Sequence, residues 1–230
     1  MKRHLTTVVF ALVSMLVVAL SGFVGWQIGS SSDTSDAQPS SSSIQIPDSV
    51  PVVAFLGDSY SKGIGASTIG KRWTTLVSAA MGWSELNLAE GGSGYTTTYM
   101  GQKTDYSIKL EVIAAAQPDI VVVSGGRNDY EAGTSAVAGT VAASLFVAIK
   151  AKAPDAQLIV TNPIWDSTDP PAGFALLSEG LRTATASAGA RYLEIGEPLA
   201  HQAGLIDPDG VHPNNIGHRA IANAVVNAVN

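Results

Sequence analysis

The sequence FLGDSYS, residues 55–61, joins an apolar run to a group of small polar residues. The residues before the junction, Val52–Leu56, are short, β-branched and apolar, as expected for a buried strand. The run breaks at Gly57, which places the hydroxyl group of Ser59 at the carboxyl end of that strand. Ligands bind at this end of the strands in open α/β sheets. The stretch therefore predicts a functional site at a strand end.

From Val52 onward the sequence alternates between strand and helix patterns. Strands are expected at Val52–Leu56, Leu86–Leu88, Ile120–Val123, Gln157–Thr161 and Tyr192–Ile195, and helices at Arg72–Met81, Ser107–Ala116, Ser135–Ala153, Ala175–Ser187 and Pro213–Val229. Continuously apolar strands suit a parallel sheet that is covered on both faces. The alternation predicts one α/β domain over residues 50–230, a three-layer α/β/α sandwich with a short, mostly parallel sheet.

The first 29 residues have a different character. Leu5–Ile28 contains no charged residue, and its 24 positions at about 1.5 Å each would span the roughly 30 Å core of a bilayer. A cleaved signal peptide with a site at Ala19–Leu20–Ser21 is the alternative, but the apolar run continues past that site, which favours an anchor. Residues 1–29 are therefore expected to export the domain, and the Ser-rich residues 30–49 to form a flexible linker.

Composition excludes several classes of function. The formal net charge of −6 gives no reason to expect nucleic acid or anionic lipid as a partner, because both attract basic surfaces. Cysteine is absent, which excludes disulfides, thiol catalysis and thiolate metal sites. The histidines and carboxylates lack metal-ligand spacing, and the glycines of residues 91–94 lack the dinucleotide-binding spacing. No metal and no cofactor are expected.

Two later polar segments could complete a site around Ser59. Gly126–Asp129 follows a second buried strand, and Asp209–His212 lies on a loop near the carboxyl terminus. Serine is a poor nucleophile unless a base removes its proton. His212 is the histidine with a carboxylate three residues earlier, at Asp209, whereas His201 and His218 are expected to be inert. Asp207 is the alternative partner of His212.

These three motifs, in this order, resemble those of the SGNH (GDSL-type) hydrolases, and the resemblance covers the chain from about Val52 to its end. It implies that Ser59 attacks an ester carbonyl while His212, oriented by Asp209, takes its proton. Asp207 fits the family pattern less well. The nucleophile elbow of α/β-hydrolases is a different arrangement, since no Gly-x-Ser-x-Gly surrounds Ser59.

The resemblance also implies an oxyanion hole, which requires preorganised hydrogen-bond donors. The first donor would be the backbone N–H of Ser59, and the third the side-chain amide of Asn128. The second would be a glycine five residues after an asparagine, and counting from Asn87 gives Gly92. Gly91 and Gly94 are alternatives, because the density of glycines blurs the alignment.

Aromatic residues close to the motifs are candidates for the substrate groove, namely Tyr60, Tyr95 and Trp165. No amphipathic insertion forms an extended apolar lid, which favours short acyl groups such as acetyl. The sequence thus predicts an exported serine esterase acting on a small-molecule or glycan ester, held at the membrane facing outside, or secreted if the N-terminal segment is cleaved. A cell-surface acyltransferase with the same triad and a non-catalytic glycan-binding module are the alternatives.

Overall fold

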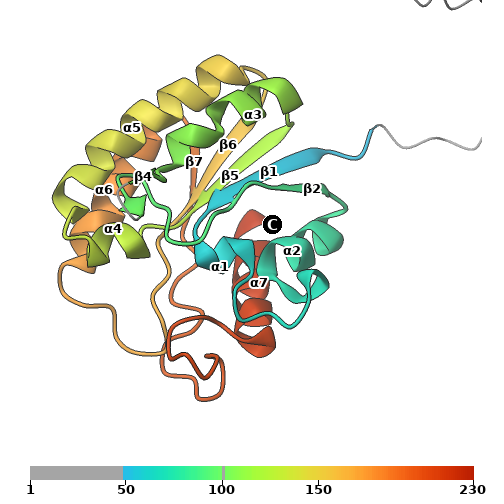
Figure 1. Ribbon diagram of the computed structural model, residues 1–230. Coiled ribbons are helices and arrows are strands. Elements are labelled where there is room, and N and C mark those ends of the chain that lie inside the picture. Colours follow the sequence, from blue (N-terminus) through green and yellow to red (C-terminus); the bar gives the residue numbers. More distant parts are fainter. Residues whose placement is uncertain (1–48, 100–101) are drawn as a thin grey trace, which may run out of the picture. The chain divides into compact units, whose positions relative to one another are not determined.

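The computed structural model of the protein describes residues 49–99 and 102–230. Its central sheet has five strands in the order β2–β1–β5–β6–β7, and every pairing is parallel (Figure 1). The strands are β1 (Val52–Gly57), β2 (Ser84–Asn87), β5 (Ile120–Ser124), β6 (Gln157–Thr161) and β7 (Arg191–Leu193). The expected parallel sheet is confirmed. Each expected strand is present: β6 has the expected bounds, and the other four differ by one or two residues at one or both ends.

Helices cover both faces of this sheet (Figure 1). One face carries α3 (Leu110–Ala116), α5 (Ser135–Lys152) and α6 (Phe174–Ser187), and the other carries α2 (Trp73–Met81) and α7 (Asn215–Val229). The predicted three-layer α/β/α sandwich is confirmed. Shorter elements complete the described chain: the helices α1 (Ser59–Lys62) and α4 (Arg127–Glu131), the 3-10 turns η1 (Ile69–Lys71) and η2 (Tyr106–Lys109), and a hairpin of β3 (Thr98–Tyr99) and β4 (Gln102–Lys103).

The apolar character of the strands follows from this layering. Alternate side chains of a strand point to opposite faces. In β1, Ala54 and Leu56 pack on the side of α3, α5 and α6, whereas Val53 and Phe55 pack on the side of α2 and α7. Both faces of the strand are buried, so a polar side chain in its middle would need a hydrogen-bond partner inside the core. Burial of each valine, leucine or phenylalanine side chain contributes roughly 1.5–3 kcal/mol to the stability of the fold.

The strand order creates a crevice beside β1. This strand pairs with β2 on one side and with β5 on the other, and Gly57 lies opposite Ser124 in the register of β1 and β5. The connections that leave these two strands run to opposite sides of the sheet, which opens a crevice at their carboxyl ends. Ser59 and Asn128 therefore leave the sheet next to each other.

One described helix, α5, is long and apolar enough to cross a membrane by length and composition. Its inner face belongs to the domain core, where Phe146 and Ile149 are fully buried. The predicted anchor or signal peptide at residues 1–29 lies outside the described residues, as does the predicted linker at residues 30–49 apart from Ser49.

Candidate active site

The turn after β1 presents Ser59 at the first position of a very short helix. Asp58 is the N-cap of α1, and its carboxylate accepts the backbone N–H of Tyr60 at 2.9 Å. The helix ends after one turn at Gly63, which has a φ of 95° in the left-handed region favoured by glycine. Because the first N–H groups of a helix have no partner within the helix, the N–H of Ser59 is available to an anion.

Asp58 is held in an unusual environment for a carboxyl group. Only 4% of the residue is exposed. Burial raises the pKa of Asp58 to about 6, and the hydrogen bond from the N–H of Tyr60 opposes this rise. The buried carboxyl group thus caps the serine turn, and its pKa lies above the usual range of an aspartic acid.

A glycine loop after β2 runs alongside the serine turn. The N–H of Glu90 donates to the carbonyl of Gly57 at 2.9 Å, and the hydroxyl group of Ser93 donates to the same carbonyl at 3.0 Å. A Cβ atom added to Gly91 would lie 4.0 Å from the Cβ atom of Ser59. The loop is therefore fastened to the end of β1 and passes directly over the serine.

The three candidate glycines of this loop occupy different places. Gly91 and Gly92 both line the cleft around Ser59, and Gly92 has a φ of 74°. Gly94 instead packs against Asp129, where an added Cβ atom would lie 2.4 Å from a carboxylate oxygen. Gly94 is thus committed to a structural contact, and Gly91 and Gly92 remain in reach of a ligand at Ser59.

Asn128 reaches the same cleft from the other side. The helix α4 starts after Gly126, whose φ of 125° requires glycine. The amide nitrogen of Asn128 donates to the carbonyl of Ser93 at 2.7 Å, which uses one of its two N–H groups. Beside it the fully buried Asp129 accepts the N–H groups of Tyr95 at 3.0 Å and Thr96 at 2.7 Å. The turn that carries Asn128 is thereby fixed to the glycine loop.

The loop before α7 supplies a paired histidine and carboxylate. Nδ1 of His212 lies 2.6 Å from Oδ2 of Asp209, whose other oxygen accepts the backbone N–H groups of Val211 and His212, both at 2.9 Å. The hydrogen bond from the imidazole, followed by those from the backbone, lowers the pKa of Asp209 to about 2. An ionised acceptor on Nδ1 keeps the proton there and leaves Nε2 as the basic nitrogen. Asp207, the alternative, offers its backbone N–H to the carbonyl of His212 at 2.7 Å.

Contacts with the serine turn hold this loop in place. The hydroxyl group of Tyr60 donates to the carbonyl of Val211 at 2.6 Å, and its ring lies 6.0 Å from the imidazole of His212. Gly65 is so close that an added Cβ atom would lie 2.3 Å from the carbonyl oxygen of Pro213. The position of His212 is therefore set by the segment that follows Ser59.

The cleft has a volume of about 450 Å³, and its lining includes four of the predicted site residues, Ser59, Gly92, Asn128 and His212. Its lining consists of Ser59, Lys62, Ile64, Glu90, Gly91, Gly92, Arg127, Asn128, Glu131, Val211 and His212. Lys62 and Glu90 form an ion pair of 2.5 Å at its rim. A hydroxyl group, a basic nitrogen and several N–H donors thus converge on one space, which is the equipment needed for acyl transfer.

None of the three aromatic residues predicted to line the groove belongs to the lining of the cleft. Tyr95 is 1% exposed and packs in the core against Tyr106 and Phe146, at ring distances of 5.0 and 6.2 Å. The expectation that Tyr95 lines the substrate groove is therefore not met, because the core takes its ring. Tyr60 is also buried and acts behind His212. Trp165 is half-buried and stacks on Arg127, with 3.9 Å between the guanidinium carbon and the ring centroid.

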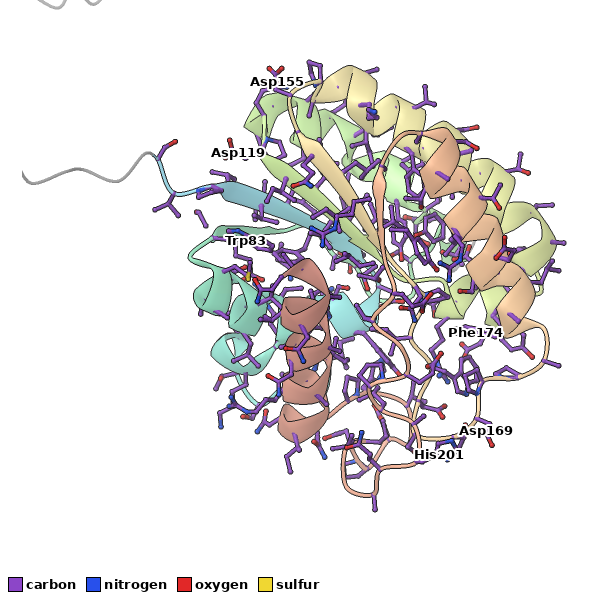
Figure 2. All side chains as sticks on the ribbon, turned by 180° about the vertical axis from the view of Figure 1, so that it is seen from behind. Trp83, Asp119, Asp155, Asp169, Phe174 and His201 are labelled. Carbon is purple, nitrogen blue, oxygen red and sulfur yellow. The ribbon has the colours of Figure 1, made fainter. Side chains whose placement is uncertain are left out.

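The other two histidines lie away from the cleft. His218 is fully buried in α7, where Nδ1 accepts the N–H of Trp73 at 3.4 Å and Nε2 donates to the carbonyl of Ile64 at 3.1 Å. Burial lowers the pKa of His218. His201 lies on an exposed loop, 3.1 Å from Asp169 (Figure 2). Among residues 49–99 and 102–230, no group of three or more histidines and carboxylates could hold a metal ion.

Two residues that shape the site were not predicted from the sequence. Ser93 joins the end of β1 to Asn128, through its hydroxyl group on one side and its carbonyl group on the other. Arg127 is buried and still lines the cleft. Both lie within recognised motifs, next to Gly92 and Asn128, and that proximity was the available signal.

Known proteins share this sequence pattern and this fold. The family model of the GDSL-like lipase/acylhydrolase family matches residues 55–220. A GDSL lipase of Mycobacterium tuberculosis is 29% identical over 190 residues, which cover 75% of this chain and 79% of the relative. In structure, the chain is similar to the psychrotrophic esterase EstA from Pseudoalteromonas sp., with a TM-score of 0.62, 16% identity, and coverage of 78% of this chain and 96% of that one. It is also similar to a family two carbohydrate esterase from Cellvibrio japonicus, with a TM-score of 0.63, 16% identity, and coverage of 79% and 62%.

Proposed function

The chain belongs to the GDSL-like lipase/acylhydrolase family and is an SGNH-type ester hydrolase, and we propose that Ser59, His212 and Asp209 are its catalytic triad. The observation that carries this proposal is that Ser59 and His212 line the same cleft, while Asp209 is hydrogen-bonded to Nδ1 of His212. A nucleophile and its base thus border one space, and the group that orients the base is hydrogen-bonded to it.

Acylation of the serine would proceed as follows. Oγ of Ser59 attacks the ester carbonyl carbon as Nε2 of His212 takes the hydroxyl proton. Asp209 stabilises the imidazolium that forms, through the bond of 2.6 Å to Nδ1. The tetrahedral intermediate then collapses, the bond to the alcohol oxygen breaks, and His212 returns the proton to that oxygen. The alcohol leaves and the acyl group stays on Ser59.

Deacylation repeats these steps with water in place of serine. His212 takes a proton from the water as its oxygen attacks the acyl carbon, and it then protonates Oγ of Ser59. In both halves the negative charge on the former carbonyl oxygen needs donors. We assign this role to the N–H groups of Ser59 and Gly92 and to the second amide N–H of Asn128. Removal of one such donor lowers kcat by roughly 10²–10³.

A short acyl group on a glycan is the substrate that we propose. The cleft of about 450 Å³ is bordered by charged side chains, including the Lys62–Glu90 pair, which suits a hydroxyl-rich alcohol better than a lipid. A family two carbohydrate esterase and an acetyl xylan esterase from Butyrivibrio proteoclasticus are among the structures with this fold. Acetylated glycans are therefore the first natural substrates to test.

We also propose that the domain is exported through residues 1–29, because Leu5–Ile28 is an uncharged apolar run of bilayer-spanning length. Fractionation of expressing cells checks this. Protein in the membrane fraction whose domain is digested by external protease supports an anchor. A mature form that starts near Gly22 and is released to the medium replaces the anchor with a signal peptide, and protein retained in the cytoplasm contradicts export.

Turnover of esters by the full chain tests the proposed function. Wild type should hydrolyse aryl acetate and react with a fluorophosphonate probe, whereas His212→Ala should lose turnover and stay folded. A protein that binds acetylated glycans with neither turnover nor labelling would be a binding module. Transfer of the acyl group to an added alcohol in preference to water would identify an acyltransferase.

A further inference from the structure

Arg127 is held rigidly in the wall of the cleft. It is 9% exposed, yet it lines the same space as Ser59 and Asn128. Nη1 donates to Asp166 at 3.1 Å and Nη2 pairs with Glu131 at 3.0 Å. A guanidinium group with both terminal nitrogens paired keeps one orientation, unlike an arginine at the surface.

A cluster of aromatic rings lies behind this guanidinium group. Its members are Tyr130, Trp165 and Phe174, whose ring centroids are 5.1–5.8 Å apart in edge-on contacts. Phe174 starts α6, close to the loops that carry Asp169 and His201 (Figure 2). Trp165 stacks on Arg127, but none of the three rings lines the cleft. Arg127 therefore separates the cleft from an apolar region.

The chemistry of ester cleavage indicates which side of the cleft would take the alcohol and which would take the acyl group. The leaving alcohol must approach His212, which protonates it. His212 packs on the segment after α1, since a Cβ atom added to Gly65 would lie 3.3 Å from its Cβ atom. Arg127 and Glu131 belong to α4, which follows β5 on the other side of Ser59. An acyl group on Ser59 that points away from the leaving alcohol would therefore lie against α4.

We propose that Arg127 determines acyl-chain specificity by ending the acyl subsite in front of the aromatic cluster, so that the enzyme takes short acyl groups. The inference rests on the proposed function, because it assumes that an acyl group is carried by Ser59. A short chain stops at the guanidinium group. A longer chain would have to displace Arg127 from Trp165, Asp166 and Glu131 together.

Removal of the guanidinium group should therefore extend the subsite to the Trp165 ring. Asp166 keeps two other partners, the N–H of Thr168 at 2.9 Å and its hydroxyl group at 2.6 Å, and Glu131 is half-exposed. The fold should consequently tolerate the loss of Arg127. Two methylene groups that become buried against the ring would raise kcat/KM by roughly tenfold.

The experiment compares aryl acetate, butanoate, hexanoate and octanoate as substrates of the full chain. The variants are Arg127→Ala and Arg127→Leu, the latter retaining apolar contact with Trp165 although it is shorter than arginine. Arg182→Ala is the matched control, because Arg182 also stacks on an aromatic ring, 4.6 Å from that of Tyr192, and also pairs with a carboxylate, Glu194, outside the cleft. Circular dichroism and fluorophosphonate labelling establish that each variant is folded and active.

Wild type should prefer acetate, and the ratio of kcat/KM for hexanoate to that for acetate should rise by about tenfold in Arg127→Ala and by less, in the same direction, in Arg127→Leu. Arg182→Ala should keep the wild-type ratio. A wild type that cleaves octanoate as well as acetate overturns the inference without any variant. So does an unchanged ratio in a folded, labelled Arg127 variant, or an equal change in Arg182→Ala. Wild type that neither cleaves an ester nor reacts with the probe overturns the proposed function instead.

Discussion

Substitution of Asn128 by alanine separates an oxyanion donor from a structural turn residue. If the amide donates to the oxyanion, the bond is strongest in the transition state, when the charge is on that oxygen. Loss of one such donor costs roughly 2.7–4 kcal/mol of transition-state stabilisation, so kcat should fall by roughly 10²–10³ while KM changes little.

The same amide also has a structural bond, so a second effect is expected. It donates to the carbonyl of Ser93 at 2.7 Å, and Ser93 is 2% exposed. A buried acceptor that loses its donor costs about 1–3 kcal/mol, which predicts a measurable drop in the free energy of unfolding of Asn128→Ala. The loss of kcat must therefore be counted per folded molecule.

Two companion variants make this assay decisive. Asn128→Asp keeps the size of the side chain but replaces both donors with acceptors, so its kcat should fall at least as far. Ser93→Ala removes a hydroxyl group whose one proton is shared between the carbonyls of Gly57, at 3.0 Å, and Glu90, at 2.6 Å, and it keeps the carbonyl that Asn128 contacts. It should lose stability and keep kcat within tenfold of wild type. A kcat of Asn128→Ala near the wild-type value, or an equal loss of kcat in Ser93→Ala, would show that Asn128 is not an oxyanion donor.

Three further variants test the supports of the site. Burial raises the pKa of Asp58 to about 6, so the fold favours the protonated form and wild type loses stability as pH rises from about 4 through 6. In urea unfolding, wild type should lose about 3 kcal/mol of unfolding free energy relative to Asp58→Asn between pH 4 and 8. Parallel pH dependences of the two proteins would contradict this. Asp209 has a pKa of about 2 and is therefore ionised throughout this pH range. Asp209→Asn should lower kcat by roughly 10⁴ at both pH 5 and pH 8, whereas a small loss would indicate a Ser–His dyad. Tyr60→Phe removes the hydrogen bond to the carbonyl of Val211, so it should lower kcat with KM unchanged and cost about 1 kcal/mol of stability. A kcat equal to that of wild type would show that this contact does not position His212.

The sheet and the long helices could be predicted because burial leaves a periodic record in the sequence. Val52–Leu56 and Ile120–Val123 are apolar at every position, since both faces of these strands are covered. The predicted helix Ser135–Ala153 differs from α5 by one residue at its end. Packing against a core stabilises these elements, and the pattern reports that packing.

The short helices that present the site could not be predicted in this way. Ser59–Lys62 and Arg127–Glu131 have four and five residues, too few to be stable alone or to show a period. They form because the strand end and a capping group, the Asp58 carboxylate in the first case, fix their start. The Thr98–Tyr99 and Gln102–Lys103 hairpin was missed for the same reason of length.

Convergence of the site residues was predictable, but their neighbours were not. Parallel strands end at one edge of a sheet, so motifs after β1 and β5 must meet there. No such rule places a loop aromatic: Tyr95 is drawn into the core by Tyr106 and Phe146, and Trp165 meets Arg127 across 38 positions of sequence. Contacts of this kind depend on the route of each loop, which local composition does not encode.

The role of Ser59 as the nucleophile is tested most directly by identifying the residue that a fluorophosphonate probe modifies. Full-length wild type is labelled, digested and sequenced by mass spectrometry, alongside Ser59→Ala checked for folding by circular dichroism. If Ser59 is the nucleophile, wild type should carry one adduct, on Ser59, and the variant should show neither labelling nor ester turnover. An adduct on another serine, such as the neighbouring Ser61, or normal turnover by Ser59→Ala, would contradict this role.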